Sequence, residues 1–183
     1  TIRQVSYDIV VVDHDSDDPS TRAYLGGLAS DVRVLRYSGA FNFSAINNWA
    51  ISKLPDGYSH YLLCNNDIEA IHEGWLERLV EQGQKPDVGV VGALLYYPDG
   101  ETIQHAGVCI GLRGPAEHYA KFLRPIGVGQ KMAAVGRMAI CHEVSAVTAA
   151  CLLISKTAFD EVGGMDESIS VGFGDVDLCL KVL

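Results

Sequence analysis

The chain has 183 residues, a length typical of one domain with its own hydrophobic core. Asp and Glu number 23 against 14 Lys and Arg, which gives a formal net charge of −9, and no run of basic residues occurs. This acidic balance argues against nucleic acid and anionic membrane surfaces as binding partners.

The first half of the chain alternates between predicted strands and helices. Residues 7–12 form an apolar, β-branched run that is typical of a strand buried on both faces of a parallel sheet. Asp18 and Pro19 predict the N-cap and the first turn of the helix that follows. Further strands are predicted at residues 32–37, 58–64 and 88–95, with helices at residues 44–53 and 74–82. This order predicts an α/β fold with a doubly wound (Rossmann-like), mostly parallel sheet and helices on both faces.

The pattern changes after residue 95. A turn precedes a predicted strand at residues 102–111, which we expect to pair antiparallel as a small extension of the sheet. Residues 113–143 are rich in Gly, Pro, His and Arg without a regular period, which indicates long loops with at most one short helix. A buried strand is predicted at residues 144–154, followed by a helix capped by Ser155 and a last helix opened by Asp175.

Five scattered cysteines without C-x-x-C spacing indicate reduced thiols in a cytoplasmic protein. The longest apolar stretches fall short of the roughly 18 residues that a membrane helix needs, so we expect no transmembrane segment. Peripheral membrane attachment of a longer protein stays open. The chain begins without Met and ends inside a predicted helix, so we expect residues 1–183 to be a single domain cut from a longer protein.

Two distant carboxylates stand out among the polar residues. Asp67 closes the predicted strand at residues 58–64, where ligands of α/β sheets bind, and it is a hard oxygen ligand suited to Mg²⁺ or Mn²⁺. Asp175 opens the last helix. One acid that holds a cation and another that deprotonates an acceptor are the minimum for moving a group off a metal-bound diphosphate. Each also has a structural alternative, since Asp67 suits a turn and Asp175 suits an N-cap.

The order of motifs resembles that of family 2 glycosyltransferases with the GT-A fold. Four segments carry the resemblance: residues 12–18 (Val-Asp-His-Asp-Ser-Asp-Asp), 43–48 (Phe-Ser-Ala-Ile-Asn-Asn), 65–67 (Asn-Asn-Asp) and 174–180 (Gly-Asp-Val-Asp-Leu-Cys-Leu). Residues 97–100, 103–107, 145–152 and 162–167 resemble the bacterial members that make O-antigen and other surface polysaccharides. The family's first strand and the part beyond residue 183 are missing, and Asn65 replaces the first Asp of the family's Asp-x-Asp motif.

The resemblance implies an inverting transferase with a UDP-, dTDP- or GDP-sugar donor, a glycan or lipid-linked acceptor, and Mg²⁺ or Mn²⁺. Asp175 would be the general base and Asp67 the metal ligand. The implied contacts to the nucleotide sugar are Asp13, His14, Asp15, Asn48, Asn65 and Asn66, beside Asp67. The acceptor side would involve His105, and Thr148 would lie beneath the sugar.

Structural alternatives stay open for most of these residues. His14 suits an exposed loop, Asn48 a helix surface, and Asn65 and Asn66 a tight turn. His105 suits a hydrogen-bonded position within a sheet, and Thr148 suits strand packing. His118 and His142, in or beside the irregular loop, contact either the acceptor or nothing. Two rival functions stay open as well: a degenerate GT-A module that binds nucleotide or a partner without turnover, and a nucleotidyltransferase.

Overall fold

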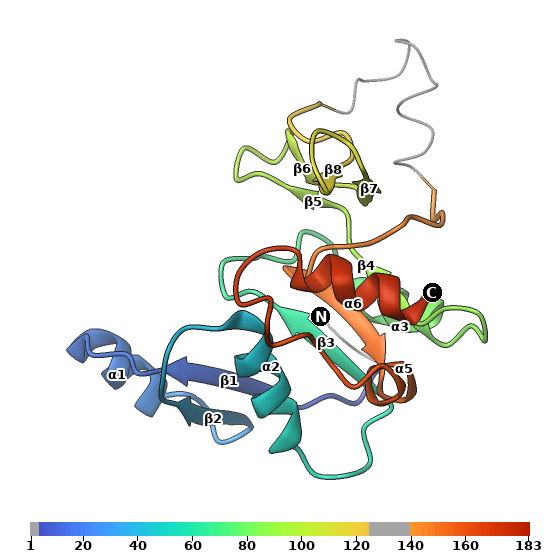
Figure 1. Cartoon of the computed structure of the whole chain (residues 1–183). Helices are drawn as coiled ribbons and strands as arrows, with labels where there is room; N and C mark the ends of the chain where they lie inside the picture. The colour runs from blue at the N-terminus through green and yellow to red at the C-terminus, as the bar shows by residue number, and fades with distance from the viewer. Residues whose placement is uncertain (1–3, 125–139) are drawn as a thin grey trace.

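The computed structural model describes residues 4–124 and 140–183 and has a mixed α/β architecture (Figure 1). Its first half contains β1 (Ile9–His14), α1 (Pro19–Gly26), β2 (Val32–Tyr37), α2 (Phe43–Ser52), β3 (His60–Cys64), α3 (Trp75–Gly83) and β4 (Val90–Gly92). Its second half contains β5 (Leu95–Tyr96), β6 (Ile103–His105), β7 (Val108–Ile110), β8 (Ala116–His118), β9 (Cys151–Ser155), α5 (Lys156–Glu161) and α6 (Gly174–Val182). The alternation expected up to β4 is confirmed.

The sheet topology corrects the expectation of a mostly parallel sheet. Within the described residues, only β1 and β2 pair in parallel, and they form a separate two-stranded sheet. In the three-stranded sheet β3-β9-β4, the central strand β9 runs antiparallel to both neighbours. A strand that is buried on both faces is apolar throughout, whether it pairs parallel or antiparallel with its neighbours. The sequence pattern of β9 therefore did not reveal its orientation.

The antiparallel extension expected after residue 95 is present, in two small sheets. The predicted strand at residues 102–111 is divided into β6, which pairs with β5, and β7, which pairs with β8. Gly107 lies at the division with φ +100°, and a Cβ there would lie 2.6 Å from Cγ1 of Val144. Figure 1 shows these hairpins projecting from one end of the three-stranded sheet.

The core is built on both faces of β9. Leu152 and Ile154 are fully buried on one face, in a cluster that includes Phe159 of α5 and Leu178 of α6. The alternate residues Cys151 and Leu153 face the other side with Leu79 of α3. Because successive side chains of a strand point to opposite faces, this one strand unites two apolar layers. Two of the predicted helix caps are confirmed: Asp18 accepts from the Thr21 N–H, and Ser155 from the Ala158 N–H.

Among the described residues, no helix combines the length and hydrophobicity that a membrane crossing requires.

Candidate active site

Asp175 lies in the first turn of α6 and is half-buried. Its Oδ1 accepts a hydrogen bond from the Val176 N–H at 2.9 Å, and its Oδ2 accepts one from the Ala149 N–H at 3.0 Å. The N-cap position belongs instead to Phe173, which has φ +58° and makes no side-chain capping bond. The N-cap alternative for Asp175 is therefore wrong. A left-handed, non-glycine residue two positions before a carboxylate is the kind of backbone strain that concentrates at functional sites.

The segment before β9 connects Asp175 with the Asn65-Asn66-Asp67 turn. Ala149 donates its N–H to Asp175, and the carbonyl of the next residue, Ala150, accepts the Asn65 N–H at 3.0 Å. Two consecutive residues thus hold the start of α6 and the end of β3. The structure therefore brings the two motifs of the sequence analysis to one end of the three-stranded sheet.

The side chains of Asn65, Asn66 and Asp67 are exposed at this end of β3. Burial, and to a smaller degree the charge of Asp67, raises the pKa of the neighbouring Cys64 thiol. Among the described residues, no three or more His, Cys, Asp or Glu side chains form a group placed to hold a metal ion. Asp67 is therefore a single exposed carboxylate in a turn.

His105 is buried, with 1% of its surface exposed. Its contact with an acceptor stays a prediction. Its Nε2 accepts backbone N–H groups from Gly107 at 3.3 Å and from Thr148 at 3.4 Å, and its Nδ1 lies 2.8 Å from Nδ1 of His118. Burial, then the neighbouring His118, lowers the pKa of His105 to about 4.

His118, on β8, and Thr148 complete this group. The rings of His105 and His118 meet edge to face with centroids 5.0 Å apart. Burial lowers the pKa of His118, Lys121 lowers it further, and Glu117 and Asp175 act in the opposite direction. Thr148 donates its backbone N–H to His105, while its Oγ1 accepts the N–H of Ala150 at 3.3 Å. Periodicity gave no sign of the pairing between the two histidines, because it joins separate strands.

Asp13 is 4% exposed, and its contact with a nucleotide stays a prediction. Its Oδ1 accepts the Ser16 N–H at 3.1 Å, and its Oδ2 lies 3.5 Å from Nε of Arg36. The hydrogen bonds from Ser16, and to a smaller degree the charges of Arg36 and Arg22, lower the pKa of Asp13. Asp13 therefore orders the loop after β1.

His14 and Asp15 attach that loop to the segment after β2. His14 donates its Nε2–H to the Gly39 carbonyl at 2.8 Å, and its ring lies 5.8 Å from that of Phe41. Asp15 adopts φ +50°, and its Oδ1 accepts the Ser38 hydroxyl at 2.7 Å. Asp15 is exposed and His14 is half-buried, and the contact of both residues with a nucleotide stays a prediction.

Asn48 uses its amide within the fold, and its contact with a nucleotide stays a prediction. Its Nδ2 donates to the Met165 carbonyl at 2.8 Å and to Oε1 of Glu167 at 3.0 Å, and its Oδ1 accepts the Met165 N–H at 3.0 Å. Both ends of the amide are therefore occupied by the segment that precedes α6.

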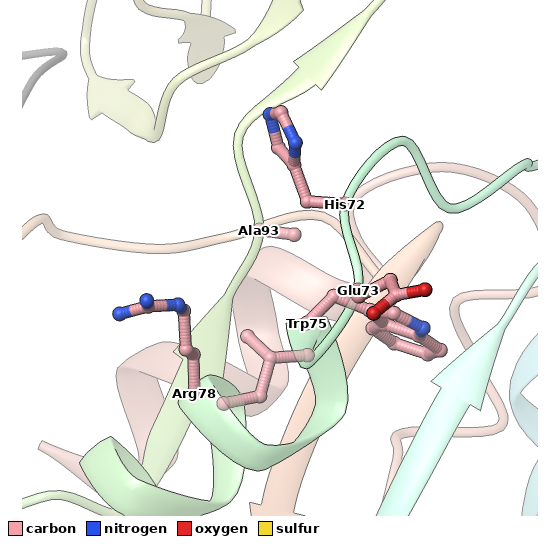
Figure 2. Close-up of a pocket in the computed structure, with 6 residues that line it drawn as sticks. His72, Glu73, Trp75, Arg78 and Ala93 are labelled. Carbon is pink, nitrogen blue, oxygen red and sulfur yellow. The ribbon is translucent and has the colours of Figure 1, made fainter. Parts of the chain in front are cut away.

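A separate hollow of about 520 Å³ lies beside α3 (Figure 2). Its lining residues are His72, Glu73, Trp75, Arg78, Leu79 and Ala93. None of these residues was predicted as a site residue from the sequence. The Asn65-Asn66-Asp67 turn and Asp175 lie instead at the end of β3 and the start of β9. We place the candidate site there because side-chain chemistry, rather than volume, distinguishes it.

No protein-family model matches the chain. It is 45% identical, over 97% of its length, to "Uncharacterized protein y4gI" of Sinorhizobium fredii, and 36% identical, over 98%, to O-antigen biosynthesis protein RfbC of Myxococcus xanthus. It is also 26% identical, over 96% of its length, to pre-mycofactocin glycosyltransferase of Mycobacterium tuberculosis. The chain spans only 19%, 14% and 33%, respectively, of the lengths of these relatives.

Proposed function

We propose that this chain is the catalytic part of an inverting, family 2 glycosyltransferase with the GT-A fold. It moves a sugar from a UDP-, dTDP- or GDP-sugar to a hydroxyl of a glycan or lipid-linked acceptor, in the synthesis of a bacterial surface polysaccharide. The observation that carries the proposal is the shared anchoring of Asp175 and the Asn65 turn by Ala149 and Ala150. The similarity to an O-antigen biosynthesis protein and to a glycosyltransferase supports the same class.

The residues at the end of β3 fit Mg²⁺ or Mn²⁺. Asp67 is exposed, and a hard cation in a nucleotide site commonly takes one or two carboxylates together with phosphate oxygens. Asp67 would hold the cation, with Asn65 and Asn66 beside it as amide partners for a phosphate or the ribose. When bound, the cation would offset the negative charge that develops on the leaving diphosphate.

Asp175 is the general base of the proposed reaction. It takes the proton from the acceptor hydroxyl while that oxygen forms a bond to the anomeric carbon of the donor sugar. The bond from the anomeric carbon to the phosphate oxygen breaks on the opposite face, so the configuration inverts and a nucleoside diphosphate leaves. The backbone N–H groups of Ala149 and Val176 orient the carboxylate for this step.

The test compares Asp175→Asn with Asp177→Asn as a matched control. Both acids lie in the first turn of α6, but Asp177 is ion-paired with Nζ of Lys181 at 2.7 Å. Transfer from UDP-, dTDP- and GDP-sugars is measured with Mn²⁺. Loss of a general base lowers the rate by roughly 10²-fold or more, so Asp175→Asn is expected to lose at least that much. Asp177→Asn is expected to keep activity within a few-fold of the unchanged protein.

Calorimetry with UDP, dTDP and GDP in the presence of Mn²⁺ accompanies the assay. Retained nucleotide binding by Asp175→Asn would separate loss of the base from loss of the fold. Equal turnover by Asp175→Asn and the unchanged protein would refute the base role. Nucleotide binding by the unchanged protein without turnover of any donor would favour the rival module that binds without catalysis.

A further inference from the structure

The hydrogen-bond pattern defines which nitrogen of each buried histidine carries a proton. Nε2 of His105 accepts two backbone N–H groups, from Gly107 and Thr148, and therefore carries no proton. The neutral ring of His105 then carries its proton on Nδ1, which lies 2.8 Å from Nδ1 of His118. His118 accepts that hydrogen bond, so a neutral His118 carries its own proton on Nε2.

The Nε2 edge of His118 is the free end of this pair. No hydrogen bond to another described residue engages Nε2 of His118, and the residue is only half-buried. Three charged groups act on its ring: Glu117, Lys121 and Asp175. The N–H groups of Thr148 and Ala149 are adjacent in the chain, and one binds His105 while the other binds Asp175. The histidine pair and the proposed general base are therefore anchored by neighbouring peptide groups.

We propose that His118 is an acceptor-binding residue and that His105 is its positioning residue. The Nε2–H of His118 donates a hydrogen bond to a hydroxyl oxygen of a sugar acceptor, next to the hydroxyl that Asp175 deprotonates. His105 fixes the Nε2–H tautomer of His118 by donating to its Nδ1. No bond is made or broken at either ring. This assignment rests on the proposed function and adds to it a recognition element for hydroxyl-bearing acceptors.

The first test is ¹⁵N NMR of the protein with labelled histidine at pH 7. Two variants, His105→Gln and His118→Gln, assign the signals of the two rings among the six histidines. Protonated Nε2 and bare Nδ1 on His118, with ¹⁵N–¹⁵N coupling between the two Nδ1 atoms, is the expected result. A proton on Nδ1 of His118, or a mixture of its tautomers, would overturn the proposal whatever the protein's activity.

The second test changes His105, which does not touch the acceptor. Glutamine can donate from its amide N–H₂ and accept at its carbonyl oxygen, as this histidine does, whereas phenylalanine can do neither. His105→Phe is expected to lower kcat/KM for octyl glycoside acceptors by about 3- to 10-fold, the equivalent of one lost hydrogen bond. His105→Gln is expected to restore most of that loss. Thermal unfolding of both variants identifies any loss that comes from the fold.

The outcomes separate this proposal from the proposed function. Acceptor kcat/KM that is unchanged in both His105→Phe and His118→Phe would overturn the histidine roles while glycosyl transfer stands. Equal losses in His105→Phe and His105→Gln would show that the donor and acceptor pattern of His105 is irrelevant, which also overturns them. If the unchanged protein transfers from no nucleotide sugar, the proposed function fails, and the acceptor role of His118 fails with it. The NMR result still decides the tautomer.

Discussion

Each predicted site residue is distinguished by where its polar atoms point. Asp13, Asn48 and His105 turn theirs inward and satisfy backbone or side-chain groups of the fold. Asp67 is exposed, and Asp175 is half-buried with both oxygens held by backbone N–H groups. A buried, hydrogen-bonded polar group contributes mainly to structure, because exposing it to a ligand breaks bonds already made. Substitution of Asp13 or Asn48 should therefore affect mainly stability, and substitution of Asp67 or Asp175 should affect activity, whereas His105 should affect stability and also acceptor use through His118.

Asn48→Ala tests the structural role of the amide. The change removes three hydrogen bonds and leaves the backbone groups of the buried Met165 without partners. The free energy of unfolding in urea is expected to fall by about 2 kcal/mol. Asn47→Ala is the matched control. Among residues 4–124 and 140–183, the Asn47 side chain donates only to the Phe43 carbonyl in its own helix, so its loss should cost less than about 1 kcal/mol. Equal costs for the two variants would contradict this account.

The buried His105 predicts a dependence of stability on pH. Its pKa is lowered from 6.5 to about 4, so between these values the unfolded chain binds a proton that the folded protein does not. The free energy of unfolding should therefore decrease as the pH falls from 6.5 towards 4, by up to roughly 1.4 kcal/mol per pH unit from this group. Urea unfolding of His105→Gln across the same range should show a smaller slope. An identical slope would contradict the prediction.

At the scale of elements, the N-terminus of α2 holds the segment that leads into α6. Asn42 donates to the Glu167 carbonyl, and Ser44 donates to the Ile169 carbonyl at 2.8 Å. The buried Ser44 also lies close to Gly174, where a Cβ would come within 2.9 Å of its Oγ. The polar residues at the start of α2 thus contact the segment that precedes α6. Removing the hydrogen bonds between the start of α2 and this segment should displace Asp175 at the start of α6.

Gly163 and Gly164 offer a matched pair that tests this packing. Both have positive φ, +75° and +76°, but a Cβ at Gly163 meets open space, whereas one at Gly164 would lie 2.8 Å from Oδ1 of Asn48. Gly163→Ala should cost about 1–2 kcal/mol of unfolding free energy for the left-handed backbone alone. Gly164→Ala should cost about 1–3 kcal/mol more, because the amide must move. Urea unfolding measures both, and equal costs would mean that Asn48 is not held firmly.

At the scale of the whole molecule, the helices, strands and caps were predictable from neighbouring residues in the sequence. Strand orientation and the partners of the site residues depend on contacts between distant residues, so they were not. Asp18 and Ser155 were predicted as caps because capping involves only the next few residues. The antiparallel entry of β9 between β3 and β4 was missed, since an apolar run has no direction. The inward use of Asn48 was missed because its partner Met165 lies 117 residues away. Asp67 and Asp175 were identifiable in the sequence, but the anchoring of their segments by Ala149 and Ala150 was not.

The central claim is that Asp67 and Asp175 belong to one site that takes a cation and a nucleotide. The most direct measurement is paramagnetic broadening of backbone amide signals by Mn²⁺, with whichever of UDP, dTDP and GDP binds. We predict that the amide signals of Asn66 and Asp67 broaden together with those of Ala149 and Val176. The broadening should be lost in Asp67→Asn and kept in the control variant Glu69→Gln. Broadening that centres on the hollow beside α3, or that persists in Asp67→Asn, would contradict the claim.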